Sequence, residues 1–116
     1  MKAELRRIHS PDVQDLRDWT PKSNDSILLQ LMVGPEGEAG EDSFDLELCT
    51  VESLADRVRE FGVLDGRHHL VFERYDFAEI ERYLKRRVAE CVGDSWEQVA
   101  SRVAQIGRWE FEDLSS

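Results

Sequence analysis

Hydrophobic and polar positions alternate along several short stretches of the chain, and this pattern predicts β-strands. Residues 43–49, SFDLELC, alternate strictly, as expected for an antiparallel strand with one buried face and one wet face that carries Asp45, Glu47 and Cys49. Residues 26–33, SILLQLMV, are almost continuously apolar, which predicts a central strand covered on both faces. Weaker patterns predict three further strands, over residues 2–8, 67–75 and 108–112.

Three other stretches repeat apolar residues at spacings of three and four, which predicts amphipathic helices. The first helix spans residues 51–61 and is capped by Thr50. Its predicted inward face consists of Val51, Leu54, Val58 and Phe61. The second and third helices run from 77 to about 91 and from 96 to 106, and each begins with a capping box. The inward faces of these two helices are predicted to be Phe77, Ile80, Leu84, Val88 and Cys91, and Trp96, Val99, Val103 and Ile106.

The order of these elements predicts the fold class. The sequence β-β-β-α-β-α-α-β lacks the regular alternation of a doubly wound parallel fold. We therefore expect one α+β domain over residues 1–116, with a mainly antiparallel sheet of about five strands and three helices packed against it. A chain of 116 residues with 41% hydrophobic residues is large enough for a single core.

The charge of the chain constrains its partners. Twenty-five acidic residues against fifteen basic ones give a net charge of −10, which disfavours nucleic acid and anionic membranes as partners. The acids are also unevenly placed, because the segment from Ser23 to Asp56 contains nine of them and no Lys or Arg. Two widely spaced cysteines, no signal peptide and no apolar run of membrane-spanning length predict a cytoplasmic protein.

The most acidic short stretch is residues 34–42, GPEGEAGED, which the strand predictions place in the turn of a long hairpin. Its acids do not have the spacing of a calcium loop, and its four carboxylates would repel a phosphate group. We therefore expect no metal and no cofactor, and we predict an exposed acidic surface that docks a partner, while the sequence leaves open whether the turn is ordered without that partner. The predicted partner-binding acids are Glu36, Glu38, Glu41, Asp42, Asp45 and Glu47.

Catalytic chemistry has few candidate residues in this chain. Cys49 and Cys91 are the only cysteines, and no glycine fingerprint, P-loop or nucleophile elbow is present. His68 and His69 cannot share one metal ion, because neighbours on a strand point to opposite faces. We expect a protein without catalytic residues. A small enzyme with an unrecognised cysteine and histidine site is the alternative.

Trp19 is the aromatic residue whose role the pattern leaves open. It lies within residues 10–24, a polar loop with two prolines. There it either packs the loop onto the core or stays exposed as a binding anchor. Trp96, Trp109 and Phe111 fall instead on the predicted inner faces of their elements.

Four stretches of the chain together resemble immunity protein family 8 of bacterial polymorphic toxin systems. They are MKAELRRIHSPD, LLQLMVGPEGEAGEDSFDLELCT, GRHHLVFERYD and GDSWEQVASRVAQIGRWEFEDL. The resemblance implies a cytosolic bacterial antidote that binds and blocks its cognate toxin domain without catalysis. Combined with the charge, it leads to the hypothesis that the toxin is basic, for example a nuclease, while deaminases and other intracellular toxins stay open. An interaction module unrelated to toxins is a further alternative.

Overall fold

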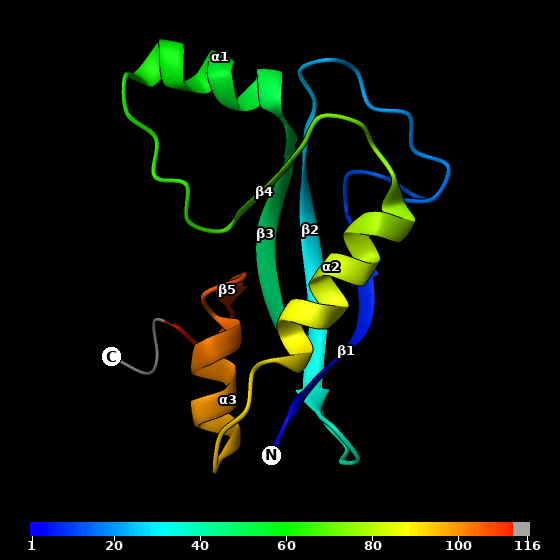
Figure 1. Cartoon of the computed structure of the whole chain (residues 1–116), viewed down its shortest axis with the longest axis vertical. Coiled ribbons are helices and arrows are strands. Elements are labelled where there is room, and N and C mark those ends of the chain that lie inside the picture. The colour runs from blue at the N-terminus through cyan, green and yellow to red at the C-terminus, as the bar shows by residue number, and fades with distance from the viewer. Residues whose placement is uncertain (113–116) are drawn as a thin grey trace.

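The computed structural model describes residues 1–112, which form a five-stranded sheet and three helices (Figure 1). The elements are β1 (Ala3–His9), β2 (Ser26–Pro35), β3 (Asp42–Thr50), α1 (Val51–Phe61), β4 (His69–Phe72), α2 (Phe77–Ala89), α3 (Trp96–Val103) and β5 (Arg108–Trp109). The predicted α+β class and element order are confirmed. No helix of residues 1–112 has both the length and the apolar character needed to cross a membrane.

The sheet has the strand order β1-β2-β3-β4, and β5 pairs with the part of β3 that β4 leaves free. All pairs are antiparallel except β3 with β4. That pair is parallel because the α1 segment carries the chain back before β4 begins. β4 is shorter than the predicted strand, and the residue that precedes it, His68, has a φ of 61° that a strand cannot contain.

One face of the sheet packs against α2 and α3 and forms the core. The buried strand residues on this face are Ile27, Leu29, Leu31, Val33, Phe44, Leu46 and Leu48. The helices contribute Phe77, Ile80, Leu84, Val88, Val99 and Val103. The inward faces predicted for the second and third helices are therefore confirmed, with Trp96 and Ile106 half-buried at the margin of the core.

Three predictions about individual faces are wrong. The second face of β2 is not covered by a layer, since Leu28, Gln30 and Met32 are only half-buried there. Cys49 is fully buried rather than on a wet face, and it lies close to Arg57 of α1. The closing strand ends at Trp109, so Phe111 is exposed.

The helix α1 has the predicted bounds, but it is turned so that most of its predicted inward face is exposed and Leu54 is half-buried. Thr50 caps it by accepting a hydrogen bond from the Ser53 N–H, and Gly62 ends it with a φ of 80°. Its predicted inward residues Val51, Val58 and Phe61 are nevertheless exposed. The helix projects beyond the β4 edge of the sheet instead of lying across it (Figure 1).

Candidate functional site

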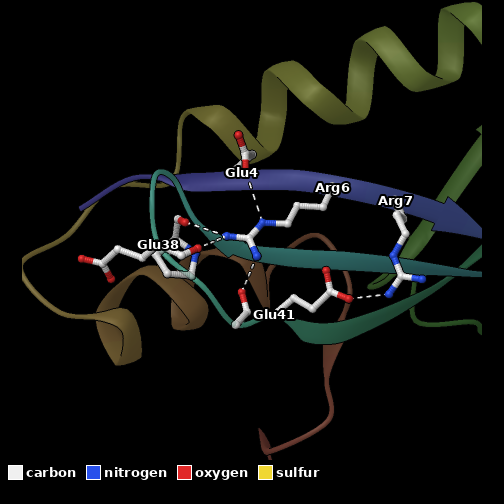
Figure 2. A network of polar contacts seen from close by, with 7 residues as sticks. Glu4, Arg6, Arg7, Glu38 and Glu41 are labelled. Atoms are coloured by element: carbon white, nitrogen blue, oxygen red, sulfur yellow. Dashed lines mark hydrogen bonds and ion pairs between the residues drawn. The ribbon is translucent and has the colours of Figure 1, made fainter.

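The acidic hairpin between β2 and β3 is held in place by Arg6 of β1 (Figure 2). The guanidinium group donates to the carbonyl oxygens of Gly40 at 2.6 Å, Pro35 at 2.8 Å and Glu38 at 2.5 Å. Its Nε also donates to Glu4 at 3.2 Å. These bonds satisfy the carbonyl groups of the turn from one central cation. The turn is thus held by contacts within the chain, a point that the sequence left open.

Gly34 explains how an arginine side chain can lie against this backbone. A Cβ atom at Gly34 would be 2.1 Å from the Gly40 carbonyl oxygen and 2.7 Å from Cζ of Arg6. Any larger side chain would therefore separate the two arms of the hairpin from the guanidinium. The glycine is required by close approach of its neighbours and has no role in flexibility.

The hairpin acids are largely matched by basic residues of the N-terminal strand. Glu41 forms an ion pair with Arg7, and Glu36 lies 3.8 Å from Lys2. The charged side chains gathered here are Glu4, Glu36, Glu38, Glu41, Lys2, Arg6 and Arg7. Four acids thus face three bases, and the carboxylate of Glu38 points away from Arg6 (Figure 2). The local field is far weaker than nine acids without a base would produce.

The carboxylate of Asp42 is used within the fold. Its Oδ2 accepts hydrogen bonds from Nε1 of Trp96 at 2.8 Å and from Nε1 of Trp109 at 3.0 Å. The two indoles come from α3 and β5, so one carboxylate joins three elements. Among the six predicted docking acids, this one has an environment that favours a structural role.

Asp45 and Glu47 project from the sheet face opposite to the helices α2 and α3. Asp45 accepts a hydrogen bond from Ser43 Oγ at 3.2 Å. Glu47 is more heavily used, because its Oε2 lies 2.7 Å from Arg57 Nη1 and 3.1 Å from Ser26 Oγ. Glu47 therefore attaches α1 to β3, and it lies apart from the turn that carries Glu36, Glu38 and Glu41.

Trp19 packs the long loop onto the molecule. Its ring lies edge-to-face with Tyr75 at 4.8 Å and with Phe72 at 6.2 Å between centroids. The ring also lines a cleft of about 470 Å³ that reaches Val51 at the start of α1. The structure thus shows Trp19 packing the loop onto the core, and its role as a binding anchor stays a prediction.

The cysteines are buried, and His68 and His69 make local contacts. Burial raises the pKa of both the Cys49 and the Cys91 thiols, which keeps them protonated and poorly nucleophilic at neutral pH. His68 Nε2 lies 2.6 Å from the Ala104 carbonyl oxygen. Among residues 1–112, no group of three His, Cys, Asp or Glu side chains is placed to hold a metal ion. Nothing in these contacts supports the enzyme alternative.

The exposed apolar side of α1 is the feature that the sequence interpretation missed. Phe61 is 65% exposed and Val51 is 50% exposed, whereas Ser53 on the same helix is buried. The signal available in the sequence was Arg57, which lies on the same side of the helix as Ser53. From there it can pair with a carboxylate of the sheet. An amphipathic pattern shows which side of a helix carries the apolar residues. It does not show which side packs against the rest of the protein.

Comparisons with known proteins give one match. A family model described as immunity protein 8 matches residues 3–114, which is nearly the whole chain. Comparisons with curated proteins and with solved structures give no match. The resemblance identified from the four sequence stretches is therefore confirmed at the level of the family.

Proposed function

The chain belongs to the immunity protein 8 family, and from this premise we propose that it binds and neutralises a cognate toxin domain as a non-catalytic inhibitor. It acts in the cytoplasm of the cell that produces the toxin. The family match over residues 3–114 is the observation that carries this proposal.

The toxin proposed here is a basic protein, for example a nuclease domain with a positively charged active site. The support is the net charge of −10 on the inhibitor. Such a charge attracts a cationic surface over several ångströms and can bring association rates toward about 10⁸ M⁻¹s⁻¹ at low salt. At physiological ionic strength the Debye length is about 8 Å, and at higher salt it is shorter, so screening removes most of this gain in association rate.

The acids of the hairpin and of the adjoining sheet face are proposed to contribute to this capture. They are Glu36, Glu38, Glu41, Asp45 and Glu47. The combined field of these acids is lowered by Lys2, Arg6 and Arg7. We expect the acids to contribute to the rate of encounter rather than to the lifetime of the complex. Changing Glu36, Glu38 and Glu41 to lysine should slow association and flatten its salt dependence. An unchanged association rate would count against this face.

Protection of cells tests the function itself. The toxin domain encoded in the gene beside this one is expressed from an inducible promoter, with and without this chain. Growth should be restored only when this chain is present, and the two purified proteins should co-elute. An unrelated acidic protein of similar size is the control for a non-specific charge effect. Failure of both rescue and co-elution would overturn the proposal.

A further inference from the structure

The end of the molecule that carries α1 exposes an apolar surface with no partner among residues 1–112. We call it the α1 surface. Its residues are Val51, Val58 and Phe61 of α1 and Val63 just after the helix. The most exposed of them lie at the C-terminal end of the helix, where Phe61 is 65% exposed and Val63 is 86% exposed. Grouped exposed apolar residues of this kind mark interaction sites in soluble proteins.

The exposure of this surface follows from how α1 is attached. Arg57 pairs with Glu47 of β3 at 2.7 Å, and Thr50 Oγ1 donates to the Ser23 carbonyl oxygen at 2.7 Å. Ser53 is buried on the same side. The helix is therefore held by its polar side, and turning the apolar side inward would break the ion pair between Arg57 and Glu47.

The surroundings of the α1 surface are acidic. Glu52, Glu60 and Asp65 lie beside it in sequence, and in the part of the chain that the structure describes no ion pair involves any of them. The basic residues of the same stretch, Arg57, Arg59 and Arg67, form ion pairs with Glu47, Asp56 and Glu112 instead. An apolar centre with an acidic rim is complementary to an apolar depression rimmed by Lys or Arg.

A concave feature continues the same surface. Val51 is shared between the α1 surface and the cleft of about 470 Å³ that Trp19, Phe72 and Tyr75 line. A cleft of this size between aromatic rings can receive one or two side chains of a partner. The α1 end therefore offers both an apolar projection and a recess with aromatic and polar walls. A protein partner of complementary shape can bury the two together.

We propose that the α1 surface is the anchor through which this protein holds its basic toxin, with Phe61 and Val58 buried at the centre of the interface. This inference rests on the function proposed above and adds the place and the chemistry of binding. A second copy of the chain is disfavoured as the occupant, because two acidic rims on two molecules of net charge −10 would face each other.

Two matched double variants test the inference. Val58→Ser with Phe61→Ser removes the proposed anchor, and Val92→Ser with Phe111→Ser removes exposed apolar residues of the same types elsewhere on the molecule. Binding is measured by biolayer interferometry against the immobilised toxin domain from the adjacent gene. We expect the first variant to raise Kd at least about tenfold, mainly through faster dissociation, and the control to change Kd less than about twofold.

The outcomes separate this inference from the proposed function. Unchanged Kd in the α1 variant, while the unmodified protein binds and protects, overturns the anchor and leaves the function standing. Absence of binding and protection by the unmodified protein overturns the function and the anchor with it. A dimer of the unmodified chain in sedimentation velocity that the α1 variant dissociates would assign the surface to self-association and also overturn the anchor. Circular dichroism establishes that both variants are folded.

Discussion

The hairpin turn at residues 36–41 and the helix α1 lie at opposite ends of the molecule, whose longest dimension is 41 Å (Figure 1). The turn is rich in acids, yet Lys2, Arg6 and Arg7 neutralise most of their charge and fix the backbone. The helix is rich in apolar residues, yet it is attached by Arg57 and leaves those residues outside. Most of the charged and polar groups of the hairpin turn therefore have partners within the chain, whereas the apolar residues of α1 face water.

This difference teaches that exposure and availability for binding are separate properties. The hairpin is exposed, but its charges and carbonyl groups already have partners within the chain. The α1 surface is exposed apolar area, from which a partner can remove water. Binding a partner gains most where water is removed from apolar area and least where existing ion pairs must be exchanged. The following predictions test this contrast, from the largest expected effect to the smallest.

Removing the carboxylate of Asp42 should have the largest effect on stability. Asp42→Ala leaves the indole N–H groups of Trp96 and Trp109 without their charged acceptor, and we expect the free energy of unfolding to fall by about 3 kcal/mol. Asp42→Asn keeps one acceptor oxygen and should cost less. Urea denaturation measures both. A loss as small as that of an ordinary surface substitution would contradict the structural role assigned to Asp42.

Removing the Arg6 clamp should have the next largest effect. Arg6→Ala deprives three turn carbonyls of a charged donor and should lower the free energy of unfolding by about 2 kcal/mol. Arg7→Ala is the matched control, because it removes only a surface ion pair with Glu41 and should cost about 0.5 kcal/mol. Hydrogen exchange of the turn amides should accelerate in the first variant alone. Equal effects of the two substitutions would show that the turn is not held by Arg6.

Two triple charge reversals with the same change in net charge should separate the two regions kinetically. One changes Glu36, Glu38 and Glu41 to lysine, and the other changes Glu52, Glu60 and Asp65 to lysine. A toxin anchored at α1 should associate about tenfold more slowly with the second variant than with the first at low salt. Stopped-flow association over a range of salt concentrations measures this ratio. A ratio of one would mean that only net charge matters, and the reverse order would favour the hairpin.

Replacing the exposed residues of α1 should have the smallest effect on folding. Val58→Ser with Phe61→Ser removes side chains that face water, so the free energy of unfolding should change by no more than about 0.5 kcal/mol. Leu84→Ala in the core is the comparison and should cost about 3 kcal/mol. A large loss in the α1 variant would show that these residues pack against the fold after all.

The fold was predictable wherever the pattern of apolar residues allows a helix or strand to pack in one way only. The helices α2 and α3 must cover the apolar face of the sheet, so their inward stripes followed from spacing alone. The helix α1 admits two solutions, because its apolar stripe and its Arg57 side can each face the sheet. The ion pair with Glu47 decides between them, and that pair depends on which strand face lies beneath the helix.

For the candidate site, the sequence by itself determined the family, the net charge of −10 and the existence of an acidic hairpin. It could not determine that β1 pairs with β2 so that Ala3 lies opposite Pro35 and brings three bases to the hairpin acids. Charges about thirty positions apart in the chain act on each other only through their separation in space, which strand pairing sets. Where the surface is negative, and where it is apolar, was therefore decided by tertiary structure.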